Sequence, residues 1–516
     1  MKIIKHWIVL LLMGVILFTS CEEKVKSSHL GAIPADAMFV ISLENEQLRK
    51  KGGLDNLKEY KFYQKITEAI GEQKPEVQKF LNDLIADPKS SGVDTKQSYI
   101  YGAKRNDGFY GAGVFVMDNL STFDKNLKKL IKSENSDLEI EDKGDYKLIG
   151  SESSSALVWN ESLLFILGGD LSDFNYKGLF TLTEDKSILS VDDFQAFIKQ
   201  SHDIGFWCSY QELMDVVAKE SNTPIPAVAS DLKGTFIHSY VNFENGEIKL
   251  AGKMSPQSKV DEYYKKYPII KKDFNDKLLG DFPETAYLTF KVAINWSEYL
   301  KLMAEAMSST EGYQADQFKA MFENPTVKTV LEALGGDVVY SIYGFAQGPM
   351  PIPLMGLSFT VKSESDFDNL RGLLPQEMIQ KTGDYYTMGS MGMGAYFAYK
   401  DNRVFVTDDT EAIKAFIGKG FDKTLKDNEL SSNYKKDPCV FYINLDLETY
   451  PESIKMMLQT NTPPEVRNYL SLLDPYKDFS YTTNNNGEFA ASLKFKDKSQ
   501  NSLKVLIKSI DDAANK

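Results

Sequence analysis

The sequence is poor in the residues that build metal centres and disulfide frameworks. Its 516 residues include only 3 cysteines and 4 histidines, so neither a multi-histidine metal site nor a cross-linked scaffold is expected. Basic residues are also in deficit, because 59 Lys and Arg stand against 73 Asp and Glu, giving a net charge of −14. Binding to phosphates needs a basic surface, so this balance argues against nucleic acid as a partner.

Motifs of the common catalytic sites are also absent. The chain has no HExxH zinc motif, no Walker A phosphate loop and no GxSxG nucleophile elbow. His202-Asp203 could form half of a serine-based triad, but the pair directly follows an expected helix, where a histidine simply suits the helix dipole. The sequence therefore leans against an enzyme and implies no cofactor.

A metal site receives little support. Asp170, Asp173 and Asn175 faintly resemble a calcium loop, but the spacing is wrong and no bidentate glutamate follows, so a solvated turn explains them better. Cys208 and Cys439 lie in apolar stretches expected to form strands. Two buried thiols are expected there, and a disulfide between them is the less favoured alternative.

The N-terminus has the layout of a lipoprotein leader. Two lysines precede an apolar run at residues 7–18, which is too short to span a membrane as a helix, and small residues lead to Cys21. This arrangement resembles a bacterial lipobox, in which the cysteine becomes the acylated first residue of the mature chain. We predict a signal peptide at residues 1–20, lipidation at Cys21 and a polar tether at residues 21–30.

Lipidation would place the protein in the cell envelope, held to a membrane through its N-terminal lipid. We expect the outer membrane. Glu22 and Glu23 follow the cysteine directly and resemble the export signals of some surface lipoproteins of Bacteroidota. Two glutamates do not decide between the periplasmic and the surface face.

Internal repetition is the most informative feature of the chain. We predict two tandem homologous copies, at residues 31–277 and 278–516, because several strings recur in the same order at nearly one offset. These are Ile-Tyr-Gly (100–102 and 342–344), Phe-Asp (123–124 and 367–368), Gly-Asp-Tyr (144–146 and 383–385) and Asn-Gly-Glu (245–247 and 486–488).

Hydrophobic periodicity alternates between two and 3.6 residues, which predicts an α+β fold with antiparallel sheets covered by helices. Hairpins are expected around residues 98–117 and 338–361, each followed by a helix, and Ser363 is expected to cap the second helix. Asn-Gly turns predict a further hairpin late in each copy. In a terminal helix, Leu503, Leu506, Ile507 and Ile510 are expected to lie on one face.

Two apolar loops distinguish the second copy. One, rich in proline, contains Met350 and Ile352, and the other contains Met391 and Met393. Proline cannot serve a central strand, so the first segment is expected to be a loop or an edge. These four residues either form an exposed docking surface or pack against the other copy.

The leader, the opening string Leu30–Ala37 and the two-copy plan together resemble a family of Bacteroidota envelope lipoproteins of unknown function, the DUF4836 family. The resemblance covers nearly the whole chain and implies no substrate and no catalytic residue. The anchor, the duplication, the scarcity of histidine and the absence of catalytic motifs favour a non-enzymatic binding or scaffold protein whose partner is an envelope protein or a glycan. The alternative is a glycan-binding or glycan-hydrolysing envelope protein, suggested by 31 Phe, 27 Tyr and 4 Trp and by the many carboxylates.

Overall fold

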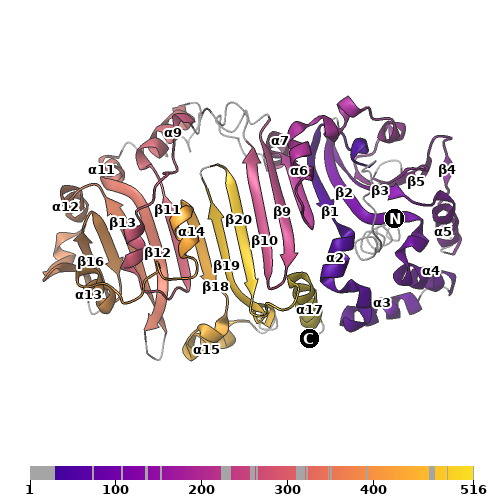
Figure 1. Cartoon of the computed structure of the whole chain (residues 1–516). Helices are drawn as coiled ribbons and strands as arrows, with labels where there is room; N and C mark the ends of the chain where they lie inside the picture. Colours follow the sequence, from indigo (N-terminus) through magenta and orange to yellow (C-terminus); the bar gives the residue numbers. More distant parts are fainter. Residues whose placement is uncertain are drawn as a thin grey trace. The chain divides into compact units, whose positions relative to one another are not determined.

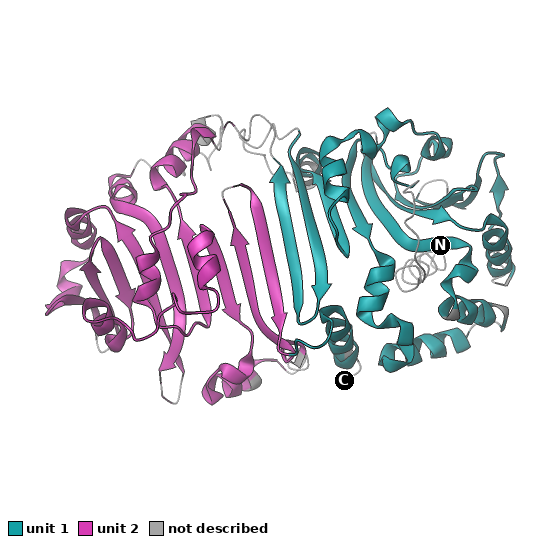
Figure 2. Cartoon of the chain, in the orientation of Figure 1, with its two compact units in different colours: residues 1–217, 233–255, 497–516 teal, residues 218–232, 256–496 magenta. Residues whose placement is uncertain are grey.

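The chain is described by a computed structural model (Figure 1). It covers residues 29–514 except 73–74, 106–107, 134–137, 152–153, 222–233, 256–261, 263–264, 309–319, 321–323, 347, 349–350, 391–392, 464–470 and 485. The predicted signal peptide, Cys21 and most of the predicted tether therefore lie outside the described residues. The chain divides into unit 1, residues 1–217, 233–255 and 497–516, and unit 2, residues 218–232 and 256–496 (Figure 2).

Unit 1 is built on antiparallel strands, with β1 (Ala37–Leu43) at the centre because it pairs on both sides, with β2 and β8. The spatial order of the strands is β4 (Glu141–Asp142), β5 (Lys147–Ser151), β6 (Ser155–Trp159), β7 (Leu163–Gly169), β3 (Gly108–Met117), β2 (Val93–Arg105), β1, β8 (Ile204–Ser209), β9 (Phe236–Glu244) and β10 (Glu247–Ser255).

Helices pack on these strands through apolar faces. On α5, Phe123 packs with Trp159 and Ile166 of the sheet, and Phe194 and Phe197 of α6 join Trp207 in the largest buried cluster of the unit. The helices of this half of the chain are α2 (Asn45–Gly52), α3 (Lys61–Gly71), α4 (Pro75–Ala86), α5 (Leu120–Ser133), α6 (Asp192–Ile198) and α7 (Tyr210–Ser221).

Unit 2 is also antiparallel, with β11 (Leu288–Ala293) pairing on both sides, with β12 and β18. Its spatial order is β14 (Ile379–Thr382), β15 (Tyr385–Ser390), β16 (Met393–Lys400), β17 (Arg403–Thr407), β13 (Ile352–Val361), β12 (Leu334–Ala346), β11, β18 (Cys439–Asn444), β19 (Tyr476–Thr483) and β20 (Glu488–Phe495). Its helices are α9 (Trp296–Ser308), α11 (Pro325–Ala333), α12 (Glu364–Gly372), α13 (Thr410–Ile417), α14 (Ser431–Lys436) and α15 (Glu452–Asn461).

The α+β class and the antiparallel hairpins expected from the sequence are confirmed. Ser363 caps α12 by accepting a hydrogen bond from the backbone N–H of Asp366. Both Asn-Gly turns join paired strands, and Gly246 and Gly487 adopt φ of 70° and 72° there, a left-handed conformation that glycine adopts without a steric penalty.

The C-terminal helix α17 (Ser502–Ala514) belongs to unit 1, although β20 before it belongs to unit 2. Its Leu503 and Leu506 pack with the cluster of Leu43, Leu48 and Phe243. Ile510 is 54% exposed, although it was expected on the same apolar face as Leu503 and Leu506, whereas its neighbour Asp511 is buried against the start of α3. The packed side of the last turn is therefore the side of Ile507 and Asp511, and Ile510 faces away from it.

The segment that follows β10 belongs to unit 2, just as α17, which follows β20, belongs to unit 1. Lys266 forms an ion pair with Glu305 of α9 at 2.6 Å, and the hydroxyl of the buried Tyr267 donates to the same carboxylate. Each unit therefore includes a segment that continues from the last strand of the other unit.

Cys208 and Cys439 are free thiols. Cys208 is buried, as expected, whereas Cys439 is only half-buried. Within the described residues, no helix combines the length and the apolar character needed to cross a bilayer.

Candidate functional site

The structure brings His202 against a serine, as a catalytic dyad would require. Nε2 of His202 lies 2.9 Å from Oγ of Ser42 in β1, and Nδ1 lies 2.7 Å from the backbone oxygen of Gln200. Because a carbonyl only accepts, Nδ1 carries the proton, and Nε2 accepts from the serine hydroxyl. Burial lowers the pKa of His202 below its usual value, so the ring is neutral at pH 7.

This pair cannot meet a substrate. Ser42 is 0% exposed and His202 is 3% exposed. The Asp203 carboxylate does not orient the ring, because it accepts instead from Lys51 Nζ and from the Phe243 backbone N–H, both at 2.7 Å. The pair therefore ties β1 to the residues that precede β8.

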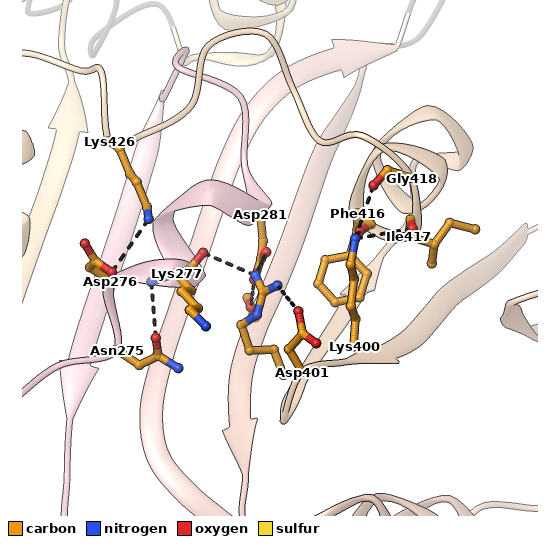
Figure 3. Close-up of polar contacts among 12 residues, drawn as sticks. Asn275, Asp276, Lys277, Asp281, Lys400, Asp401, Phe416, Ile417, Gly418 and Lys426 are labelled. Atoms are coloured by element: carbon orange, nitrogen blue, oxygen red, sulfur yellow. Dashed lines mark hydrogen bonds and ion pairs between the residues drawn. The ribbon is translucent and has the colours of Figure 1, made fainter.

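A buried ion pair lies in unit 2, between Asp281 and Arg403 (Figure 3). Arg403 in β17 donates to Asp281 and, at 3.3 Å, to the backbone oxygen of Lys277. Ser358 Oγ in β13 donates to the other carboxylate oxygen at 2.7 Å. Burial raises the pKa of Asp281 to about 6, although the Arg403 charge opposes the shift. The cluster holds the turn at residues 276–281 onto the sheet.

Two lysines of unit 2 are likewise used by the fold. Lys400 Nζ donates to the carbonyls of Phe416, Ile417 and Gly418 at 3.1–3.3 Å, which closes the C-terminus of α13 (Figure 3). Lys291 in β11 is fully buried and donates to the backbone oxygens of Tyr434 and Asp437, the latter at 2.5 Å. Burial lowers the pKa of Lys291 to about 8, yet no substrate can reach it.

The loop that resembled a calcium site holds an arginine instead. Arg105 donates to the backbone oxygens of Asp170, at 3.4 Å, and of Ser172, and its guanidinium lies 5.0 Å from the Phe174 ring centre. The side chain of Asn175 accepts from the backbone N–H of Gly178, as in an ordinary turn. Among the described residues, no three His, Cys, Asp or Glu side chains are grouped to hold a metal ion.

A hollow of about 530 Å³ lies beside the first turn of α5, lined by Leu120, Ser121, Asp124, Lys125 and Lys128. Its carboxylate is already engaged, because Asp124 accepts from Trp159 Nε1 at 2.9 Å and pairs with Lys147. The remaining polar side chains at the hollow are exposed surface groups, so it presents no preorganised chemistry.

The β12–β13 hairpin and α15 project along the lower edge of unit 2 in Figure 1, and both carry exposed apolar side chains. Ile352, at the start of β13, is 58% exposed, and Met456 and Met457 of α15 are 55% and 39% exposed. Phe345, which lies opposite Pro353 in the hairpin, contacts the rings of Tyr287 and Tyr450, and these two rings contact each other, with centroids 4.6–5.9 Å apart. We call these six residues the apolar end.

Of the four docking residues expected from the sequence, only Ile352 is placed by its side chain. Met350 and Met391 lie outside the described residues, and Met393 is placed in β16 without a described side chain. Sequence reasoning missed Met456 and Met457. Their signal was available as two adjacent methionines on one short helix, where only one can face the core.

Comparisons with known proteins place the chain in a family without giving it an activity. Among curated proteins, none is significantly similar in sequence. Two crystal forms of TP0453 are matched at 11% and 10% identity, over 46% and 44% of this chain and 82% and 80% of the other, with TM-scores of 0.25 and 0.24. A family model described as a domain of unknown function (DUF4836) matches residues 30–503. The chain therefore belongs to the DUF4836 family.

Proposed function

We propose that this protein is a lipid-anchored envelope protein that binds a partner and does not catalyse a reaction. The observation that carries the proposal is that the polar side chains resembling catalytic groups form their hydrogen bonds inside the fold. The Ser42–His202 pair, the Asp281–Arg403 pair and Lys291 are all buried and form hydrogen bonds within the fold. The specialised exposed surface is apolar, as in binding proteins.

We further infer that the two units arose by duplication of one α+β module. The strands of each unit, numbered in chain order, have the same spatial order. Two isolated bridges also match, Pro34 with Ser187 in unit 1 and Pro283 with Thr424 in unit 2. Around these prolines the sequence repeats as Leu-Gly-x-x-Pro-x-x-Ala, at residues 30–37 and 279–286. A superposition of residues 31–277 on 278–516 that fails to align both Asn-Gly turns would contradict this inference.

The anchor is proposed from the leader alone, with acylation of Cys21 and an outer-membrane location. In cells fed labelled palmitate, the wild-type protein should incorporate label and fractionate with the outer membrane. Cys21→Ser should abolish both, since the serine hydroxyl does not form the thioether. Equal labelling of the two proteins would refute lipidation.

Binding is tested by capture. The lipidated wild-type protein, used as bait in detergent-solubilised envelopes, should retain a partner. A variant with Ser at Met350, Ile352, Met391 and Met393 should retain less of that partner. A thermal melt of the same variant provides the control. Exposed docking residues should leave the midpoint nearly unchanged, whereas a large drop would identify them as buried between parts of the chain.

A glycan ligand is the second candidate, favoured by the partly exposed rings of Tyr287, Phe345 and Tyr450. Sugar rings stack on such faces through apolar contact. Titration with envelope oligosaccharides should then quench tyrosine fluorescence, and Tyr450→Ala should weaken the quenching. Release of reducing ends from the same oligosaccharides would indicate hydrolysis.

A further inference from the structure

The β12–β13 hairpin, which contributes Phe345 and Ile352 to the apolar end, has no charged residue along most of its length. From Val338 to its end, β12 contains no charged residue, and β13 contains none. A hairpin of this kind does not have to lack charge. In the β2–β3 hairpin of unit 1, β2 ends in Lys104 and Arg105, and Lys104 pairs with Glu212 and Asp215. A carboxylate does lie beside β13, because Asp408 accepts from the Met355 backbone N–H at 2.9 Å. The residues of the two strands from Val338 onward carry no charge themselves, so they suit surroundings that cannot solvate charge.

Proline also removes backbone donors at this end. Pro351 and Pro353 flank the exposed Ile352, and neither has a backbone N–H. In hydrocarbon every unpaired N–H is costly, so their loss favours entry into lipid. The same prolines disfavour a protein partner that would add a strand to this hairpin, because such a partner needs those donors.

Tyrosine rings and charged pairs border the apolar end. Phe345 pairs with Pro353 next to the exposed Ile352. The hydroxyls of Tyr287 and Tyr450 donate to the backbone oxygens of Thr449 and Asn444, at 3.1 and 2.7 Å. Lys455 on α15 pairs with Glu452 at 3.2 Å, and Lys496 pairs with Asp446 at 2.7 Å. Exposed aliphatic side chains beside tyrosine rings and charged pairs are the groups that proteins present to the hydrocarbon, the interface and the water of a bilayer.

We propose that the apolar end of unit 2 inserts into the outer layer of a lipid bilayer. Ile352, Met456 and Met457 enter the acyl region, and the Tyr287 and Tyr450 rings lie at the headgroup level. Three aliphatic side chains give only weak, reversible attachment, comparable to a single acyl chain, so this contact orients a protein more than it anchors it. The proposal goes beyond the proposed function and does not require acylation of Cys21.

The test uses the mature chain with Cys21→Ser, so that no acyl group is attached, and vesicles of neutral phosphatidylcholine. The protein should float with the vesicles, and binding should be nearly equal at 50 mM and 500 mM salt, because no charge drives it. Ile352→Asp and Met456→Asp should each reduce the vesicle-bound fraction by about ten-fold or more.

Phe109→Asp is the matched control. Phe109 is 50% exposed at the start of β3, on the charged hairpin of unit 1, so this variant should float like the parent protein. Unchanged melting midpoints confirm that the variants fold. Failure of the parent protein to float, or flotation of Ile352→Asp at the parent level, overturns the proposal. Because the protein is unacylated throughout, neither result bears on palmitate labelling at Cys21.

Discussion

His29 is the first described residue and is buried without a hydrogen-bond partner in the described part of the chain for either ring nitrogen. Its ring contacts Tyr99, with centroids 4.8 Å apart. Desolvation lowers the pKa of His29 to about 4 from its usual 6.5, with Asp94 opposing the shift. The folded protein therefore holds a neutral imidazole at a pH where the unfolded chain is protonated.

This pKa difference predicts acid sensitivity. Since the pKa is lower in the folded state, the stabilisation from His29 is complete above pH 6.5 and is lost as the pH falls toward 4. Between pH 7.5 and 5.0, the wild-type free energy of unfolding should fall by about 2 kcal/mol more than that of His29→Leu. Urea titrations at both pH values measure the difference. Parallel losses in the two proteins would show that His29 is not the group responsible.

If the two units are duplicates, as proposed above, the buried ion pair of unit 2 is matched by apolar residues in unit 1. On that alignment, Ser358 opposite Phe405 would correspond to Val114 opposite Phe165, and Arg403 to Leu163. Asp281 would correspond to Ala32, because Pro34 and Pro283 each form an isolated bridge two residues later. Ala32, Val114 and Leu163 all belong to the buried core of unit 1.

Removing one partner of such a pair costs more than replacing the whole cluster. Arg403→Leu leaves the Asp281 carboxyl buried without its cation and should lower stability by about 3–5 kcal/mol. The triple variant Asp281→Ala, Ser358→Val, Arg403→Leu adopts the residues of unit 1 and should be at least about 2 kcal/mol more stable than the single variant. Chemical denaturation at pH 7 compares them, and an equally unstable triple variant would contradict the argument.

At the scale of elements, α17 completes the N-terminus of a helix distant in sequence. Tyr60 precedes α3 but makes no side-chain cap. The Asp511 carboxylate accepts instead from the backbone N–H groups of Lys61 and Phe62, at 2.6 and 2.7 Å. A carboxylate at this position satisfies two exposed donors and complements the helix dipole.

Asp511→Ala should therefore destabilise unit 1 by about 1–2 kcal/mol and speed amide exchange in the first turn of α3. Asp512→Ala is the control. Its carboxylate pairs with Lys61 Nζ at 2.6 Å, but both side chains are about half exposed, so the loss should stay below about 0.5 kcal/mol. Hydrogen exchange with denaturant titration separates the two, and similar effects from both variants would exclude a capping role for Asp511.

At the scale of the whole molecule, the passage of α17 into unit 1 makes the two halves of the chain interdependent. A chain of residues 21–255, which lacks α17, should bind a separately produced chain of residues 256–516 in solution. Its open site consists of α2, α3 and the β9–β10 hairpin, where Gly246 N–H bonds to the Gln500 carbonyl at 2.9 Å.

Shortening the second chain to residues 256–496 should weaken that association by at least about ten-fold, because the helix and its Asp511 cap are removed together. Co-purification and analytical ultracentrifugation provide the measurement. An unchanged dissociation constant after the truncation would mean that α17 does not help to join the halves.

Much of the local structure could be predicted from the sequence. The Asn-Gly turns, the Ser363 cap and the two principal hairpins were predicted because turn chemistry and hydrophobic period act over a few residues. The prolines around Ile352 predicted a loop or an edge, but β13 already begins at Ile352 and includes Pro353, and the sequence left open whether Ile352 is exposed. The hydrogen-bond partner of His202 could not be predicted from the neighbouring sequence, because Ser42 lies 160 residues away along the chain.

By itself, the sequence determined the element types, the α+β class, the charge balance and the repeated strings, all of which follow from composition and short-range pattern. Only the tertiary structure decided which unit α17 joins. It also decided that Ser42 contacts His202 in the buried interior, and that Ile507 is packed while Ile510 of the same helix is exposed. These outcomes depend on which distant surfaces bury one another. That choice is made by packing summed over the whole fold, and no single segment encodes it.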